Sequence, residues 1–236
     1  MSALPPRPAP RARRVSRVGL TAALALVCAT LLARGGPAVA FARPAEIGVE
    51  IYAAGCALVP RHGSGVALGD HLVATAAHVV AGATDVTVVE HDGTKHAAQI
   101  AALDTRRDAA VLRARTLERA PIRFGVLVAG EPASYLGFAG AHPNTVIPLV
   151  VERAITIGSE DIYIKDNYTR PGYQVHGDVI AGDSGAGVLS ARGSLAALIW
   201  AADRVAEREA FAVSASVVTD LLPAVGPSPA PAVPCP

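Results

Sequence analysis

The sequence has few aromatic residues, few cysteines and little that could span a membrane. Aromatic side chains make up 4% of the 236 residues, and the chain holds one tryptophan, one methionine and three cysteines. Apolar residues nevertheless account for 51% of the chain, whereas disordered chains are poor in them. The composition therefore excludes a disordered protein and indicates one or two globular domains.

The first forty residues lack any acidic side chain, although they contain six arginines. A charge-free stretch from Val18 to Ala33 follows most of these arginines, and the small residues Ala38, Val39 and Ala40 come after it. A basic head, an apolar middle and a small-x-small site are typical of a bacterial export signal, with cleavage after Ala40. The alternative is a single uncleaved membrane anchor, but 16 residues are short against the roughly 20 that span a bilayer. We expect residues 1–40 to direct export, by a Sec or twin-arginine route that the sequence leaves open.

Basic residues do not predominate in the remainder of the chain. After residue 40, 15 of the 21 lysines and arginines stand against all 20 acidic residues, a net charge of −5. Domains that bind nucleic acid carry a basic patch that neutralises phosphates. We therefore expect no nucleic-acid partner, and a membrane contact only if the first segment stays uncleaved.

Two cysteines, Cys56 and Cys235, remain once the export signal is removed. In an exported chain such a pair is more often a disulfide than a metal or redox site. Six histidines show no metal-ligand spacing, and we interpret them as surface residues: His62, His71, His91, His96, His142 and His176. We expect no metal and no cofactor.

Short apolar runs bounded by Gly, Asp, Asn or Pro follow one another closely after residue 40. They predict strands at Gly65–Leu68, His71–Thr75, Asp85–Glu90, His96–Leu103, Ala109–Ala114, Ala133–Phe138, Val146–Ile157, Asp161–Lys165, Tyr173–Val175, Gly187–Ser190, Leu195–Trp200 and Glu209–Ala215. Because no long helical pattern lies between them, the strands indicate an antiparallel sandwich or barrel. A short helix is expected over Val217–Leu222, followed by a proline-rich tail.

Three separated segments contain the side chains of a nucleophilic hydrolase. His78 lies in VATAAHVV, Asp108 precedes the apolar run AAVL, and Ser184 lies in VIAGDSGAGVL. A serine hydroxyl is a weak nucleophile, so it needs an imidazole to take its proton and a carboxylate to orient that imidazole. The order His, Asp, Ser is that of chymotrypsin, and no histidine follows His176 as the α/β-hydrolase order would require. Asp104 is the rival carboxylate, four residues earlier.

The three segments also carry a family resemblance. TAAHVV, DTRRDAAVL and GDSGAGVL resemble the active-site segments of chymotrypsin-like serine proteases. Cys56 ahead of GSGVALGDHLVATAAHVVAGA, the segment TRPGYQVHGDVIAGDSGAGVL, and Cys235 look more narrowly like the actinobacterial periplasmic acid-resistance proteases called MarP. The similarity runs over most of residues 47–236 and does not extend to that family's multi-span membrane domain. It departs from the family at Ala186-Gly187, where these proteases usually have Gly-Pro.

The resemblance implies an all-β fold of two antiparallel six-stranded β-barrels with a short C-terminal helix. The active site would lie in the cleft between the barrels, and Cys56 would be bonded to Cys235. The expected divisions are a protease domain at 41–222, with barrel one at about 46–124 and barrel two at about 125–222, and a proline-rich tail at 223–236.

The resemblance also implies a role for each site residue. His78 would be the general base, Asp108 its orienting partner and Ser184 the nucleophile. The backbone N–H groups of Gly182 and Ser184 would form the oxyanion hole. No zymogen step is expected, because Ile47-Gly48-Val49-Glu50 matches the activating terminus of trypsin-like zymogens only loosely.

Substrate selectivity rests on three residues that the resemblance places in the substrate cleft. Asp178 stands where trypsin-like enzymes bind Arg or Lys, which indicates cleavage after basic residues. Trp200 and Ala201 follow Ile199 in place of the usual Ser-Trp-Gly wall, and Ala201 would narrow the pocket. The sequence therefore leaves open whether cleavage occurs after basic residues or whether Ala201 narrows the pocket against them.

The leading hypothesis is an exported serine endopeptidase that acts on extracytoplasmic or cell-envelope proteins. The alternative from another class is a catalytically silent member of the fold that binds peptides or a partner. An HtrA-like quality-control protease is a third hypothesis, but about fifty residues after Ser184 are too few for a PDZ domain. The sequence indicates no oligomeric state.

Overall fold

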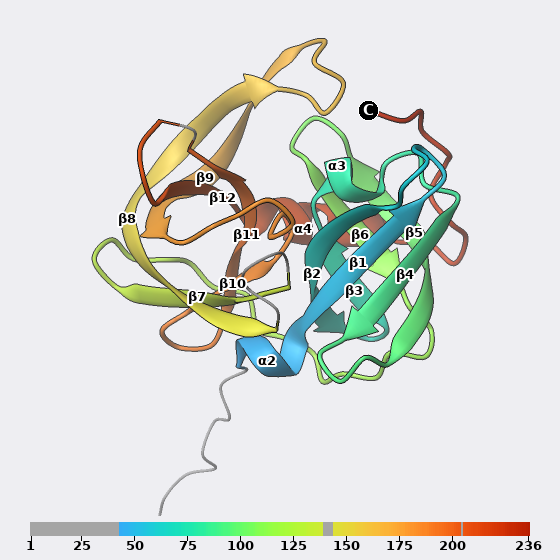
Figure 1. Cartoon of the computed structure of the whole chain (residues 1–236), viewed down its shortest axis with the longest axis horizontal. Coiled ribbons are helices and arrows are strands. Elements are labelled where there is room, and N and C mark those ends of the chain that lie inside the picture. The colour runs from blue at the N-terminus through green and yellow to red at the C-terminus, as the bar shows by residue number, and fades with distance from the viewer. Residues whose placement is uncertain (1–42, 139–143, 204) are drawn as a thin grey trace, which may run out of the picture. The chain divides into compact units, whose positions relative to one another are not determined.

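Short antiparallel strands dominate the computed structural model, which describes residues 43–138, 144–203 and 205–236. The expected export segment and His142 lie outside these ranges. Figure 1 shows two barrels side by side, and they confirm the predicted fold class. No helix in the described ranges is long and apolar enough to cross a membrane.

Barrel one closes in the strand order β1-β2-β3-β6-β5-β4. Its strands are β1 (Gly48–Ala54), β2 (Arg61–Gly69), β3 (Leu72–Thr75), β4 (Asp85–Glu90), β5 (Lys95–Asp104) and β6 (Ala109–Arg113). Apolar side chains that alternate with polar ones along a strand point to one face, so they fill the barrel. In β1 the buried members are Val49, Ile51 and Ala53.

Barrel two closes in the order β10-β11-β12-β9-β8-β7. Its strands are β7 (Pro132–Gly137), β8 (Thr145–Glu160), β9 (Asn167–Gly177), β10 (Gly187–Ser190), β11 (Leu195–Ala202) and β12 (Glu209–Ser214). Tyr135, Leu149, Val175 and Ile199 belong to its core. The long hairpin of β8 and β9 reaches toward the C-terminal end of the chain, where the Tyr163 hydroxyl donates to the Pro234 carbonyl at 3.2 Å (Figure 1).

Apolar residues from both barrels meet between them. Leu189 and Leu198 of barrel two join the cluster that contains Val66 of barrel one. Gly187 is needed at this junction, because a Cβ there would lie 2.5 Å from the Val66 Cβ. The helix α4 (Ser216–Leu221) contributes Val218 to the same cluster, so it packs between the barrels.

Two further helices and a C-terminal strap, formed by the proline-rich tail, complete the fold. The helix α2 (Pro44–Ile47) precedes β1, and α3 (Ala77–Val80) follows β3. After the 3₁₀ helix η1 (Leu222–Ala224), the proline-rich tail runs along barrel one, where the Ala230 N–H donates to the Ile100 carbonyl at 2.7 Å.

The structure corrects two sequence-based expectations about strands. Residues Asp161–Lys165 were expected to form a strand but form the turn between β8 and β9. The Asp161 carboxylate accepts the Tyr163 and Lys165 N–H groups, at 3.0 Å each, and these bonds replace strand pairing. Strand β1 was not expected at all.

Candidate active site

His78 lies on α3, immediately after strand β3. The strand ends at Thr75, and the single helical turn that follows projects the imidazole from the barrel, with 36% of the side chain exposed. The Asp108 carboxylate accepts two hydrogen bonds from this residue, from its backbone N–H at 2.8 Å and from Nδ1 at 2.7 Å. Asp108 therefore fixes both the helical turn and the ring.

Asp108 is 5% exposed and occupies a left-handed conformation with φ of 59° just before β6. Burial on its own would raise the pKa of the Asp108 carboxyl, but hydrogen bonds and positive charge from His78, together with the charge of Arg170, hold that pKa below its ordinary value. The Trp200 indole N–H also donates to Oδ2, at 2.9 Å. The carboxylate thus stays ionised although it is buried.

Ser184 lies on the loop before β10, where barrel two touches barrel one. The Ser64 N–H on β2 donates to the Ser184 carbonyl at 2.9 Å, and the Ser64 hydroxyl donates to the Gly182 carbonyl at 2.9 Å. Gly185 has φ of 89°, and a Cβ there would lie 2.3 Å from both the Ser64 carbonyl and the Thr75 Oγ1. The glycine next to the serine is therefore required by close packing of the two barrels.

The Ser184 hydroxyl points toward β11 and donates to the Trp200 carbonyl at 3.5 Å. Within the described ranges it makes no hydrogen bond to the His78 ring. The N–H groups of Gly182 and Ser184 have no acceptor in those ranges either, so they are available to a substrate oxygen. Gly182 has φ of 99°, a conformation that a side chain would strain.

Asp183 lies between these two N–H groups and is fully buried. Its carboxylate accepts the Tyr135 hydroxyl at 2.7 Å and the Ile180 N–H at 3.0 Å. The Tyr135 hydroxyl also lies 2.9 Å from the Asp178 carbonyl. Burial and the charge of Asp183 raise the pKa of Tyr135, so the phenol remains a donor. One buried tyrosine therefore ties both ends of the loop before Ser184 to β7.

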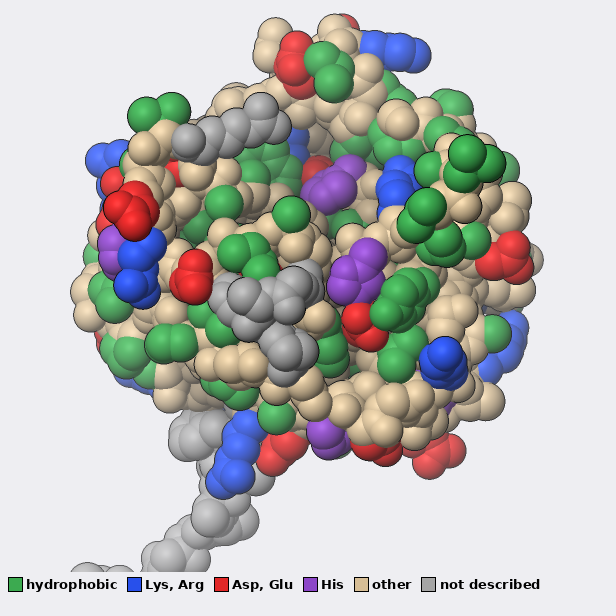
Figure 2. Space-filling view, viewed as in Figure 1, with side chains coloured by type: hydrophobic (Ala, Val, Ile, Leu, Met, Phe, Trp, Pro, Cys, Tyr) green, Lys and Arg blue, Asp and Glu red, His purple; other side chains and the backbone are tan. Residues whose placement is uncertain are grey.

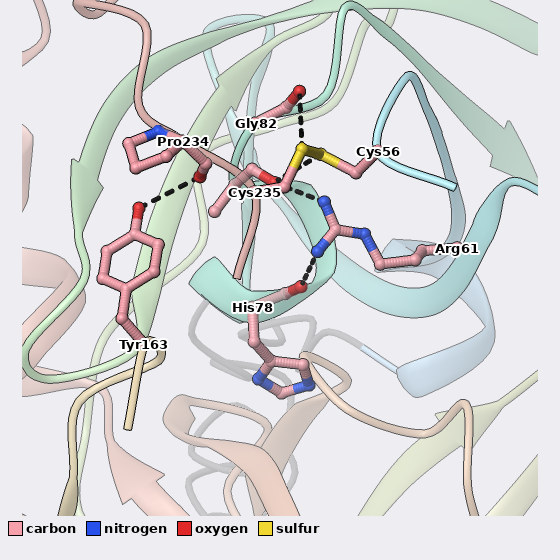
Figure 3. The surroundings of a disulfide bond; sticks show 8 residues. Cys56, Arg61, His78, Gly82, Tyr163, Pro234 and Cys235 are labelled. Carbon is pink, nitrogen blue, oxygen red and sulfur yellow. Dashed lines mark hydrogen bonds between the residues drawn. A yellow bond between two sulfur atoms is a disulfide. The ribbon is translucent and has the colours of Figure 1, made fainter. Parts of the chain in front are cut away.

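The predicted disulfide between Cys56 and Cys235 is present, with Cα atoms 5.6 Å apart (Figure 3). Its sulfurs lie against the turn after α3, 3.5 Å from the Ala81 carbonyl and 3.9 Å from the Gly82 carbonyl. A Cβ on Gly82, whose φ is 74°, would lie 2.7 Å from Cys56 Sγ and from the Cys235 N. The tail is therefore fastened directly behind the helix that carries the imidazole.

Arg61 reinforces the same end of α3 (Figure 3). Its guanidinium donates to the His78 carbonyl at 2.9 Å and to the Ala81 carbonyl. A helix leaves its last carbonyls without partners, and a cation at that end is favourable. The arginine therefore caps the turn that positions His78.

This geometry places an oriented histidine beside a serine loop with two free backbone donors, as serine peptidases require. A family model described as a trypsin-like peptidase domain matches residues 63–198. The chain belongs to the trypsin-like peptidases.

Among the relatives of this trypsin-like peptidase are the serine proteases MT3772 and Rv3671c of Mycobacterium tuberculosis. Each is 30% identical over 197 residues, which cover 80% of this chain and 48% of the relative. The chain thus spans about half the length of the curated relatives it matches. Rv3671c is MarP, so the resemblance stated from the sequence is confirmed.

Solved structures agree with the family assignment. The crystal structure of the Rv3671c protease in its active form is 27% identical, covers 81% of this chain and 86% of that chain, and has a TM-score of 0.75. The HtrA-type protease AlgW with a tripeptide is 21% identical and covers 78% of this chain and 61% of its own, with a TM-score of 0.66. At that identity AlgW shows the fold alone.

The expected selectivity residues of this peptidase lie on barrel two. Exposed Asp178 lines a pocket of about 300 Å³ between the β9 end and the β11–β12 hairpin, together with Asp203 and Glu209. Neither His78 nor Ser184 lines it, and half-buried Ala201 is not part of its wall. The Trp200 indole N–H donates to Asp108.

The rival carboxylate Asp104 and the buried His96 have structural partners. Asp104 binds the N–H groups of Arg106 and Arg107 and the Arg107 Nε, with no bond to His78. His96, expected at the surface, is 6% exposed, because Glu90 and Thr116 bind its two ring nitrogens at 2.7 Å each. The described residues contain no group of three or more His, Cys, Asp or Glu that could hold a metal ion. On the face of the molecule drawn in Figure 2, Lys and Arg side chains are scattered rather than gathered into a patch.

Three residues that shape the site were not found from the sequence: Arg61, Tyr135 and Arg170. Each is a single polar side chain in or beside an apolar strand, and no spacing marks it. Arg170 had one signal, because it takes an inward-facing position of β9, but only the short core of that strand was expected. The contact of the Trp200 indole with Asp108 was also missed, because the two residues are distant in sequence.

Proposed function

We propose that this trypsin-like peptidase is an exported serine endopeptidase that cleaves extracytoplasmic or cell-envelope proteins. His78 takes the proton of the Ser184 hydroxyl as its oxygen attacks the peptide carbonyl, and returns it to the leaving amine. The resulting acyl-enzyme is hydrolysed by a water that His78 deprotonates in turn. Asp108, rather than Asp104, holds the imidazole in the required tautomer.

The observation that carries this proposal is the double hydrogen bond from His78 to Asp108, on the barrel against which the Ser184 loop is docked. It presents Nε2 of the ring as the acceptor that a serine nucleophile needs. The Gly182 and Ser184 N–H groups would bind the oxyanion, and each such donor lowers the barrier by about 3 kcal/mol.

One observation favours the silent alternative. The Ser184 hydroxyl donates to the Trp200 carbonyl at 3.5 Å and not to His78. Hydrogen bonds in free enzymes are often long and tighten only with substrate, and rotation about one side-chain bond redirects a serine hydroxyl. The long bond therefore does not decide for the silent form, because it also fits a resting state that substrate reorganises.

Export is proposed mainly from the first forty residues. Their arginines, the charge-free stretch 18–33 and the small residues at 38–40 support signal cleavage after Ala40. The disulfide of the mature part fits an oxidising compartment.

A fluorophosphonate probe tests both parts of the proposal. Full-length protein expressed in a secreting bacterial host should be recovered with Phe41 as its first residue and should gain one probe per chain. Ser184→Ala should gain none, and turnover of a protein substrate should fall by about 10⁶. Correctly folded, processed protein that takes up no probe would instead be the silent form.

A further inference from the structure

Arg170 is a buried charge that the proposed mechanism does not use. It lies on β9 with 1% of its surface exposed. Its Nη2 donates to the Ser159 hydroxyl at 2.6 Å and to the Glu160 carbonyl at 3.0 Å, while Nε and Nη1 have no hydrogen-bond partner within the described ranges. Burial of a charge costs several kcal/mol unless other charges compensate for it. Strand β9 does not need an arginine at position 170 to form, so the buried charge calls for another role.

The guanidinium is stacked on the face of Trp200, with Cζ 4.8 Å from the ring centroid. A cation over an indole face is attracted by the ring quadrupole, and more strongly when both groups are away from water. The edge of the same indole donates its N–H to Asp108 Oδ2, the oxygen that also accepts His78 Nδ1. Arg170, Trp200, Asp108 and His78 therefore form one continuous chain of contacts.

We propose that Arg170 and Trp200 are positioning residues that keep the Asp108 carboxylate ionised and aimed at His78. The indole N–H occupies one side of Oδ2, which leaves the other side to the imidazole. The guanidinium supplies a positive charge behind the ring. This inference rests on the proposed triad. It adds two residues from barrel two that control the ionisation and orientation of Asp108.

Charged groups from α3, β9, β5 and the turn after β5 act on this chain of contacts. His78 on α3 and Arg170 on β9 face Asp108, and Asp104 at the end of β5 acts on Arg170. Arg107 pairs with Asp104 at 2.6 Å and offsets that carboxylate. Arg170 is therefore the cation of barrel two that acts on the His78–Asp108 pair.

The sign of the pH effect follows. Loss of the guanidinium charge or of the indole N–H makes the ionised carboxylate less favourable, so the His78–Asp108 pair binds a proton more tightly. The pair titrates as a unit, and a higher pH is then needed to free the base. The acid limb of the pH profile of kcat/KM should move upward.

The test compares Arg170→Gln with Arg170→Lys and with Arg153→Gln. Arg170→Gln should raise the midpoint of the acid limb by about one pH unit. Arg170→Lys keeps the charge and should leave the limb near its wild-type position. Arg153 is exposed on β8 and has no contact with Asp108, so Arg153→Gln loses the same charge without a shift. A folded Arg170→Gln with the wild-type midpoint overturns the proposal.

Trp200→Phe provides a second variant that leaves Arg170 in place. It loses the indole N–H while it keeps an aromatic ring, so its limb should move in the same direction by less. A higher KM with an unmoved limb would mean that the ring only contacts substrate, and would refute its positioning role.

A measurement on the resting protein separates this inference from the proposed function. Trp200 is the one tryptophan of the chain, so intrinsic fluorescence reports proton uptake by the pair next to it without any turnover. The fluorescence midpoint should rise in Arg170→Gln and not in Arg153→Gln, even if the wild-type protein takes up no fluorophosphonate. Equal midpoints in both variants contradict the inference whatever the activity.

Discussion

The two barrels hold their parts of the proposed triad in different ways. Barrel one secures the helical turn of His78 from outside, by the Cys56–Cys235 disulfide and by Arg61 on its last carbonyls. Barrel two secures the loop of Ser184 from inside, by the buried pair of Tyr135 and Asp183. One barrel depends on a covalent strap, and the other on buried polar groups.

The difference has an energetic basis. A cross-link acts mainly on the unfolded chain, so its loss lowers stability and loosens whatever it fastened. A buried hydrogen-bonded charge contributes little net stability, but removal of its partner is costly and local. A reductant should therefore lower stability mainly through barrel one. Removal of the Tyr135 hydroxyl should instead disturb the Ser184 loop of barrel two.

The largest effect is expected from loss of the disulfide. Its cysteines are 179 residues apart, and closure of such a loop contributes about 5 kcal/mol to the free energy of unfolding in the chain-entropy model. Reduction should lower the melting temperature strongly and lower turnover, because Cys235 and the tail are no longer bonded to Cys56 against the turn after α3. Urea unfolding with and without dithiothreitol measures the change.

A double variant, Cys56→Ser with Cys235→Ser, is the matched control. It should be as unstable as the reduced protein and should not respond to dithiothreitol. Unchanged melting and turnover of the wild-type protein after verified reduction would show that the strap plays no part in barrel one.

Removal of the Tyr135 hydroxyl is expected to have an intermediate effect. In Tyr135→Phe the Asp183 carboxylate loses a donor inside the core, which should cost about 1–3 kcal/mol of stability. The greater change should be in kcat, because Asp183 lies between the two proposed oxyanion donors. Tyr173→Phe is the control, since Tyr173 is a buried tyrosine of the same core and makes no side-chain hydrogen bond in the described ranges.

The same contact bears on activation. Since the Tyr135 hydroxyl and the Ile180 N–H already bind Oδ2 of Asp183, wild-type protein should be active without a new terminus at Ile47. Sequencing of the active enzyme from its N-terminus checks this, and a first residue of Ile47 in active material alone would contradict it.

The contrast between the barrels also explains how far the sequence could predict this molecule. Strand spacing and the order of His78, Asp108 and Ser184 are carried by local patterns, and the family resemblance adds the two barrels and the disulfide. Tyr135 and Arg170 act through contacts between strands distant in sequence, and no pattern in one segment shows such contacts. The missed strand β1 is different, because the alternation of Val49, Ile51 and Ala53 was a signal available in the sequence.

The smallest effect is expected from Asp104, the carboxylate first considered as a rival to Asp108. Burial would raise the pKa of Asp104, but hydrogen bonds from Arg107 and Arg106 and the Arg107 charge lower it below its ordinary value. A group with a lowered pKa adds stability above its unfolded pKa and loses it as pH falls through the folded pKa. Asp104→Asn should thus cost about 1 kcal/mol near neutral pH, and the difference should shrink as pH falls through the lowered pKa of Asp104.

Catalysis distinguishes the two carboxylates. Asp104 contacts the turn before Asp108 and not the imidazole, so Asp104→Asn should keep kcat close to the wild-type value. Asp108→Asn should lower kcat by about 10⁴, because an amide fixes the wrong tautomer of His78. If Asp104→Asn and Asp108→Asn lose activity equally at matched stability, Asp104 and Asp108 act as one unit. Barrel one would then hold its part of the site by buried charge, as barrel two does.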